Sequence, residues 1–106
     1  MVFNTGAALL DAVVLAIVSR EQMGTYGYRI TQDIRNVIDI SESTLYPVLR
    51  RLQKEACLET YDVAIDGRNR RYYKITENGR AQLNLYRGEW SVYAGKISRI
   101  LEEADR

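Results

Sequence analysis

The stretch from Ser41 to Ala56 places the strongest constraint on how this chain can fold. Its apolar residues recur at intervals of three and four, which forms one stripe along a helix: Leu45, Val48, Leu49 and Leu52. The remaining sides carry hydroxyl groups, an aromatic ring and cations: Ser43, Thr44, Tyr46, Pro47, Arg50, Arg51 and Lys54. Such a helix suits the major groove of DNA, although an ordinary amphipathic helix with a solvated basic side has the same pattern. The neighbouring segments must decide between these two interpretations.

A chain of 106 residues predicts one domain with a modest core. Its 46% hydrophobic and 27% charged residues are typical of a soluble globular protein. The longest apolar run, residues 12–18, is too short to cross a bilayer, so no membrane partner is expected. Residues 1–12 lack the basic segment of a signal peptide, and the single cysteine, Cys57, fits a reducing compartment as a small core residue. We therefore expect a cytoplasmic protein.

The charge of the chain is distributed unevenly. The formal net charge is only +1, but residues 50–74 hold seven cations against four acids. That segment therefore carries +3 and the remainder −2, which makes a local basic patch of moderate strength. Arginine outnumbers lysine 12 to 3, and the planar arginine fork suits phosphates and guanine edges.

Two further helices are expected before the basic one. Residues 7–19 are apolar on nearly all sides except at Asp11, which predicts a helix buried on most sides. A loop around residues 20–27 precedes a second helix over roughly residues 28–37, with these residues on its buried side: Ile30, Ile34, Val37 and Ile38. The third helix is capped by Ser41 or Ser43. Pro47 favours a start near Ser43 or a local bend, because proline fits only the first turn of a helix without cost.

The pattern changes to strands after Leu58. Tyr61, Val63 and Ile65 alternate with polar residues, a turn is expected over residues 66–69, and alternation resumes over residues 71–75. Three helices and a hairpin predict a mainly α fold with a small β-hairpin, a winged helix-turn-helix, over residues 1–76. The polar residues of the hairpin would reach phosphates or a minor groove beside the third helix: Arg68, Asn69, Arg70, Arg71 and Lys74.

Residues 77–106 predict one long helix, with Thr76 as its N-cap. Apolar residues recur along it at alternating intervals of three and four, and Leu101 lies beside them: Leu83, Tyr86, Trp90, Tyr93, Ile97, Ile100 and Ala104. At 1.5 Å per residue this helix would be about 40 Å long, longer than the body from which it projects. We call this row of apolar residues the seam. The helix over residues 7–19 of the same chain can cover only part of it. The seam therefore predicts a dimerisation helix, and the simplest partner is a second copy of the chain.

The sequence argues against an enzyme. It contains no histidine, no CxxC pair, no phosphate-binding glycine loop and no GxSxG motif, so we expect no catalytic residues, metal ligands or cofactors. A dimerisation or adaptor module that binds no DNA is the remaining alternative. A mobility-shift experiment separates the two, because only the DNA-binding protein should show salt-dependent binding to duplex DNA.

Three motifs together resemble one family. The run TLYPVLRRLQKE at residues 44–55 resembles the signature of PadR-like transcriptional regulators. Tyr26-Gly27-Tyr28 resembles the start of their second helix, and residues 71–79 resemble the exit from their wing. The motifs cover almost the whole chain in the right order. The resemblance implies a homodimer that binds a palindromic operator in double-stranded DNA and represses transcription.

The short tail resembles the small subgroup of this family, and residues 89–101 resemble the helix of its multidrug-binding members. In those members a tryptophan from each subunit lines an aromatic pore at the dimer interface. Trp90 matches that position, so the resemblance implies that Trp90, flanked by Tyr86 and Tyr93, binds a planar aromatic or cationic effector. The chain departs from the family at Ala56, where glycine usually closes the third helix. We therefore expect this helix to end differently.

Overall fold

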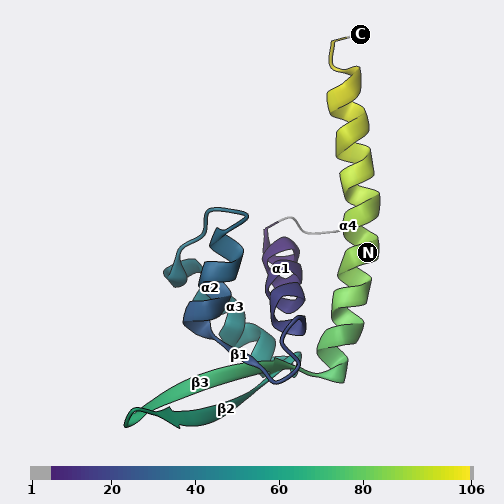
Figure 1. Ribbon diagram of the computed structural model, residues 1–106. Coiled ribbons are helices and arrows are strands. Elements are labelled where there is room, and N and C mark those ends of the chain that lie inside the picture. Colours follow the sequence, from purple (N-terminus) through teal and green to yellow (C-terminus); the bar gives the residue numbers. More distant parts are fainter. Residues whose placement is uncertain (1–5, 106) are drawn as a thin grey trace.

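The computed structural model describes residues 6–105. The outer limits predicted for the two domains, residues 1 and 106, lie outside the described residues. So does the first part of the segment that was predicted not to be a signal peptide. Figure 1 shows three short helices grouped above a small sheet, and a long fourth helix that rises away from them. The elements are α1 (Ala7–Ser19), β1 (Thr25–Tyr26), α2 (Gly27–Arg35), α3 (Glu42–Lys54), β2 (Leu58–Ile65), β3 (Arg68–Ile75) and α4 (Glu77–Glu103). The predicted fold class, mainly α with a small antiparallel sheet, is confirmed.

The core lies between α1, α2, α3 and the inner face of the sheet. α1 has the predicted extent and contributes Val14, Leu15 and Val18, which are all fully buried. The other helices and the sheet complete this cluster with mostly aliphatic side chains: Ile30, Ile34, Leu45, Leu49, Leu52, Leu58 and Ile75. Burial of this apolar surface is the main force that holds the helices together. Asp11 is buried in the same helix, and its partners are described below.

α2 ends two residues before its predicted end, and its predicted buried side is partly wrong. The helix stops at Arg35, after which Val37 N–H bonds to the Ile34 carbonyl oxygen at 2.9 Å. The chain then turns away, and this leaves the Val37 side chain 79% exposed and Ile38 41% exposed. Ile40 enters the core instead. The prediction failed because it continued a helical period past the point where the helix ends.

α3 begins at Glu42, so Ser41 is the N-cap of the two that the sequence offered, and the helix starts one residue before Ser43. The Ser41 hydroxyl oxygen accepts a hydrogen bond from Thr44 N–H at 3.3 Å. Pro47 is therefore the sixth residue of the helix, where it removes the N–H that would have bonded to the Ser43 carbonyl. Both residues are exposed, so water can satisfy that carbonyl.

The end of α3 has a left-handed geometry that favours glycine, although the residue is alanine. Ala56 has φ 62°. Its N–H bonds to the Gln53 carbonyl at 3.0 Å, and Cys57 N–H bonds to the Leu52 carbonyl at 2.9 Å. These two bonds define a Schellman motif, and the side chains of Leu52 and Cys57 are both buried beside it. The expectation that this helix ends differently is wrong, because the closing bonds outweigh a left-handed penalty of about 1 kcal/mol.

Replacing Ala56 with glycine should therefore stabilise the protein. Glycine adopts φ 62° without steric cost, so the free energy of unfolding should rise by about 1 kcal/mol. Urea denaturation followed by circular dichroism measures this change. The control is Ala81→Gly, the same substitution at an exposed position inside α4, which should lower the free energy of unfolding by about 1 kcal/mol. A loss of stability in both variants would contradict this account of the helix end.

The sheet has three antiparallel strands in the order β1-β3-β2, one more strand than predicted. β1 lies in the segment predicted as a loop, because two residues are too few to show alternation. The turn between β2 and β3 consists of Asp66 and Gly67 alone, with φ 51° and 75°. These positive values at both positions match the tight hairpin turn that Asp-Gly favours. The predicted four-residue turn is thus too long, and Arg68 pairs with Ile65 in the ladder.

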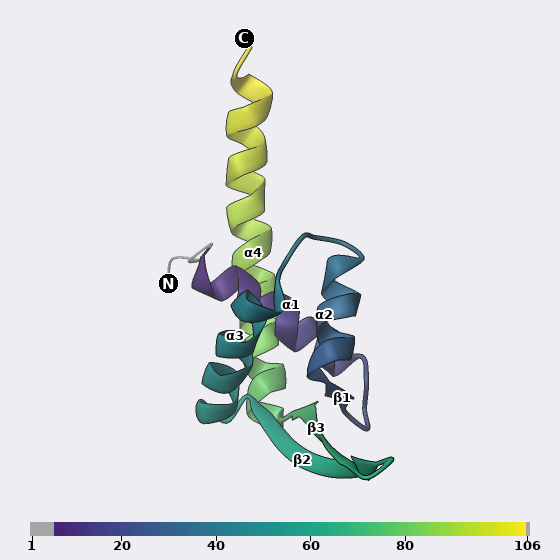
Figure 2. The same cartoon turned by 90° about the vertical axis from the view of Figure 1, so that its left-hand side faces the viewer.

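α4 begins where it was predicted, at Glu77, and Thr76 caps it by accepting a hydrogen bond from Gly79 N–H at 2.9 Å. Its first turns pack on α1, and the rest projects away from the body (Figures 1 and 2). The described chain measures 62 × 26 × 21 Å as a result. The division into two domains at Thr76 stays a prediction. Leu83 in α4 packs in the same core as the first three helices.

Candidate nucleic-acid interface

The outer side of α3 is exposed along the length of the helix. The four residues predicted to be buried are buried, which turns the opposite side towards solvent. That side presents hydroxyl groups, a proline ring and two cations: Ser43, Thr44, Pro47, Arg50 and Lys54. Tyr46 is half-buried against Gly27, where a Cβ would lie 2.8 Å from the Tyr46 hydroxyl oxygen. Glycine at the start of α2 therefore makes room for the Tyr46 ring. Contact of this surface with DNA stays a prediction.

Three hydroxyl groups meet at the start of α3. The Ser41 hydroxyl lies 3.0 Å from the Ser43 hydroxyl and 3.0 Å from the Thr44 hydroxyl. Each hydroxyl group offers one donor and two acceptor sites, so a single local bond leaves capacity for another partner. Ser43 and Thr44 are thus oriented by Ser41 and still available to a base edge or a phosphate.

An open cleft separates the start of α2 and the side of α3 from the wing, which we define as β2, β3 and their turn. Figure 1 shows the wing extending outward beneath α2 and α3. Tyrosines from β1, α2 and α3 and three arginines from the wing line this cleft: Tyr26, Tyr28, Tyr46, Arg68, Arg70 and Arg71. Asn69 lines it as well, whereas Lys74 does not and lies opposite Glu59 near the base of the wing. The structure therefore brings the three predicted wing arginines together in one cleft, whereas the other predicted cations lie outside it.

A row of aromatic rings supports the wing. The Tyr61 and Tyr72 rings stack with centroids 5.4 Å apart, and Tyr26 meets Tyr72 edge-on at 5.5 Å. The Arg70 guanidinium lies 4.2 Å from the centroid of the Tyr26 ring. Such a cation–π contact contributes about 0.5–1 kcal/mol at an exposed site. Tyr61 also donates a hydrogen bond to the Met23 carbonyl, which ties the wing to the loop after α1. Arg70 is thus held at the edge of the cleft.

Arg71 has a weaker attachment. Its Nε lies 3.6 Å from an Asp62 carboxylate oxygen across the hairpin, and both side chains are about half exposed. Exposed ion pairs of this kind contribute little to stability. Arg71 therefore remains able to exchange Asp62 for a phosphate.

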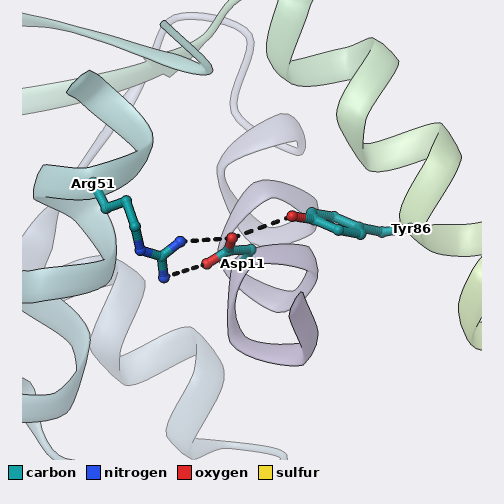
Figure 3. A network of polar contacts seen from close by, with 3 residues as sticks. All are labelled: Asp11, Arg51 and Tyr86. Atoms are coloured by element: carbon teal, nitrogen blue, oxygen red, sulfur yellow. Dashed lines mark hydrogen bonds and ion pairs between the residues drawn. The ribbon is translucent and has the colours of Figure 1, made fainter. Parts of the chain in front are cut away.

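Arg51 lies apart from the wing arginines and is paired within the protein, and its contact with DNA stays a prediction. Its two terminal nitrogens bond to the two carboxylate oxygens of Asp11, both at 2.7 Å (Figure 3). Asp11 is only 3% exposed and lies in α1, behind α3. Tyr86 of α4 donates a further hydrogen bond to the same carboxylate at 3.2 Å. Removing Arg51 from this pair would leave a buried charge without its main partner, at a cost of about 3–5 kcal/mol.

Asp11 and burial together alter the pKa values of Arg51 and Tyr86. The hydrogen bond with Asp11 raises the pKa of Arg51, which stays charged. Burial, and then the negative charge of Asp11, raise the pKa of the Tyr86 phenol to about 12. Asp11 is the exception in an otherwise apolar helix, and no role was predicted for it. The available signal was its position, because a buried carboxylate requires a partner.

The predicted seam on α4 divides into two parts. Leu83 is 4% exposed and packs in the core of its own chain, and Tyr86 is half-buried with its hydroxyl turned to Asp11. Their contact with a partner chain, and that of Tyr86 with an effector, stays a prediction. The later seam residues point into solvent in the single chain: Trp90, Ile97, Ile100, Leu101 and Ala104. Tyr93 is half-buried, and its ring centroid lies 6.2 Å from that of Trp90.

Other kinds of site find little support among residues 6–105. No group of three or more His, Cys, Asp or Glu side chains in this range could hold a metal ion. No described helix is long and apolar enough to cross a membrane. Cys57 is buried, and burial raises the pKa of its thiol, as expected for a core residue without a reactive role.

Sequence and structure comparisons with known proteins identify the same family. The sequence profile described as "Transcriptional regulator PadR-like family" matches residues 14–85. An uncharacterized protein of Lysinibacillus sphaericus is 40% identical over 99 residues, which is 88% of each chain. The crystal structure of a Streptococcus mutans UA159 protein, smu.1704, is 42% identical, has a TM-score of 0.81 and covers 97% of this chain and 95% of its own.

A second similar structure contains DNA. It is Bacillus subtilis PadR in complex with operator DNA, with 19% identity and a TM-score of 0.67. The match covers 74% of this chain and 45% of that one, which is a larger protein. At this level of identity the similarity shows a shared fold.

Proposed function

The chain belongs to the PadR-like family of transcriptional regulators, and from this premise we propose that it represses transcription as a homodimer on a palindromic operator in double-stranded DNA. Members of this family are regulators, which confirms the prediction that the chain is not an enzyme. The cleft between α3 and the wing carries the DNA-binding part of the proposal, since Tyr46 and three wing arginines meet there beside the exposed side of α3. A regulator of this kind acts in the cytoplasm.

We place α3 in the major groove, with the wing over the adjacent backbone. Ser43, Thr44 and Tyr46 are then the residues nearest to base edges, while Arg50 and Lys54 anchor phosphates. The wing contributes Arg68, Asn69, Arg70 and Arg71 along the cleft. Two copies related by a two-fold axis would bind half-sites about one helical turn apart, or about 34 Å. The operator complex of the Bacillus subtilis relative, which shares this fold, supports DNA binding by such a fold.

Arg50→Ala and Arg70→Ala should each weaken operator binding. Each variant leaves one phosphate per subunit without its cation, so the slope of log affinity against log salt should become shallower by about 1 for each such phosphate. Fluorescence anisotropy with a labelled operator over a salt series measures both effects. The melting temperature of Arg50→Ala should fall by no more than about 2 °C, because this side chain is exposed. Arg70→Ala also loses the contact with the Tyr26 ring, so its melting temperature should fall by a few degrees.

Arg99→Ala is the matched control for these two variants. Arg99 is an exposed arginine near the C-terminal end of α4, away from the cleft, and its removal makes the same change in net charge. Its operator affinity should match that of the wild type. Unchanged affinity in both Arg50→Ala and Arg70→Ala would contradict the proposed docking.

The proposed homodimer uses the outer part of α4. Ile97 is 38% exposed, Ile100 64% and Leu101 69%, on a helix that extends well beyond the body of its own chain (Figure 2). Ala104 follows at the same helical spacing. Apolar residues at intervals of three and four favour association with a second helix, because this buries them. A two-fold axis through this region would place one α4 beside the other.

The effector proposal rests on Trp90 and Tyr93. The Trp90 side chain is 43% exposed, and its ring is tilted by 39° to that of Tyr93. Across a two-fold axis, two indoles and two phenols would form one aromatic surface. Planar cations stack on such surfaces, with about 0.5–2 kcal/mol for each cation–π contact. We therefore propose a planar aromatic or cationic effector that releases the repressor from its operator.

Titration with planar cationic dyes should quench the fluorescence of Trp90, which is the only tryptophan of the chain. The expected result for Trp90→Ala is a dimer that no longer binds these dyes, as judged by dye anisotropy and sedimentation. If Trp90 only fills the interface, its removal should instead weaken the dimer by several kcal/mol. Absence of quenching by every dye in the panel would remove the effector proposal and leave the DNA-binding proposal intact.

A further inference from the structure

Three helices share one buried carboxylate. Asp11 in α1 has both oxygens bonded to Arg51 of α3, and one of them also accepts the hydrogen bond from Tyr86 of α4 (Figure 3). The proposed function uses α3 to bind DNA and the outer part of α4 to bind a partner and an effector. Asp11 is therefore the point at which these two elements are joined by polar bonds.

The same two helices are also tied at a second place, which we call the joint and define as residues 55–57 with residues 76–79. The Thr76 hydroxyl donates to the Ala56 carbonyl at 2.6 Å, and Thr76 N–H donates to the Cys57 carbonyl at 3.1 Å. The Asn78 side-chain amide donates to the Glu55 carbonyl at 3.2 Å. The start of α4 thus satisfies carbonyl groups at the end of α3, which fixes these two helix ends relative to each other.

The joint fixes where α3 and α4 meet, so the angle between these two helices depends on contacts further along them. Tyr86 lies ten residues beyond Thr76, about 15 Å along α4, and Arg51 lies within two turns of the end of α3. The bonds to Asp11 therefore close a triangle between α3, α4 and the joint. A tilt of α4 that displaces Tyr86 must either break its bond to Asp11 or move the carboxylate, and Arg51 follows the carboxylate through two short bonds.

We propose that Asp11 is a positioning residue of the DNA-binding helix, through which the tilt of α4 sets the angle of α3. This inference rests on the proposed function and adds to it the route by which the outer helix controls DNA binding. Trp90 lies one turn beyond Tyr86 on α4. A change at the aromatic surface therefore reaches α3 through a hydroxyl, a carboxylate and a guanidinium. The carboxylate is 3% exposed, so water cannot readily replace a lost partner.

The test uses full-length protein, a labelled operator, and a temperature at which circular dichroism shows every variant to be folded. Tyr86→Phe removes one hydroxyl and keeps the ring, so it should weaken operator binding by about threefold. Arg51→Gln should weaken binding by about tenfold or more. Because both residues act through Asp11, the double variant should bind no more weakly than Arg51→Gln alone. A direct contact between Arg51 and DNA would instead make the two effects multiply.

Thr60→Val is the matched control. The Thr60 hydroxyl lies 3.3 Å from the side-chain amide of Gln53 in α3, so this variant also removes a hydrogen-bonded hydroxyl beside that helix, but one outside the Asp11 cluster. Its operator affinity should equal that of the wild type. If Tyr86→Phe behaves like Thr60→Val, Asp11 has a structural role alone and the inference is wrong.

Trp90 supplies a second readout that stability alone would not change. Coupling between two sites is reciprocal, so operator binding should shift the emission of Trp90 in the wild type and shift it less in Tyr86→Phe. An emission that does not respond to operator in the wild type overturns the inference. If the wild type binds no operator at all, the proposed DNA-binding function fails as well, and the anisotropy of the labelled operator shows this directly.

Discussion

Replacing Gly79 with alanine should destabilise the protein by about 3 kcal/mol. A Cβ at this position would collide with the Cys57 carbonyl oxygen and lie 2.8 Å from the Ile75 side chain. The carbonyl belongs to the backbone and is held by Thr76 N–H, so it cannot move aside cheaply. The first turn of α4 would have to lift away from the end of α3. Thermal and urea denaturation measure the loss.

Gly88→Ala is the control for this prediction. Gly88 lies two turns further along the same helix, and a Cβ there would have no neighbour within 4 Å. Alanine should stabilise that position by about 0.5–1 kcal/mol, because it lowers the conformational entropy of the unfolded chain. Equal stability of the two variants would contradict the close approach of α4 to the end of α3.

Replacing Ile97 and Ile100 together with glutamate should convert the proposed dimer to a monomer or an aggregate. The double variant would place like charges from both chains against each other in an apolar seam. Such contacts cost several kcal/mol, so the dissociation constant of the dimer should rise about a thousandfold, or about 4 kcal/mol. Sedimentation velocity over a range of concentrations measures this change.

Leu85→Glu with Val92→Glu provides a control with the same change in charge. Both residues are exposed on α4, but Leu85 and Val92 face away from the seam. The control should sediment as the wild type does. An intact dimer of the Ile97 and Ile100 variant would show that the seam on α4 is not the interface.

Much of the fold follows from patterns within single elements. α1 and α4 begin at the predicted residues, because a change of composition or an N-cap such as Thr76 marks each start. The buried stripe of α3 follows from spacing alone. β1 escaped prediction because two residues become a strand only through pairing with Tyr72 and Tyr73 of β3. Val37 and Ile38 show the opposite error, in which a local period outlasts its helix.

The candidate site was harder to predict than the fold, because it depends on contacts between elements. Spacing places Arg51 on the same helix as Arg50, but only tertiary structure shows that Arg51 turns back to Asp11, 40 residues earlier. Leu83 and Tyr86 continue the apolar period of the seam without a break, yet the body of the chain covers them. The stack of Arg70 on Tyr26 likewise requires β1 to lie beside β3.

Selection of DNA by the purified protein tests the central claim most directly. The protein is incubated with a pool of genomic fragments, the retained DNA is sequenced, and the affinity for the enriched sequence is measured between about 50 and 200 mM salt. We predict an inverted repeat with half-sites about ten base pairs apart. With Arg50, Lys54 and the three wing arginines on phosphates in both copies, the slope of log affinity against log salt should be about −9. A pool without enriched sequences, or binding that does not depend on salt, would contradict the account.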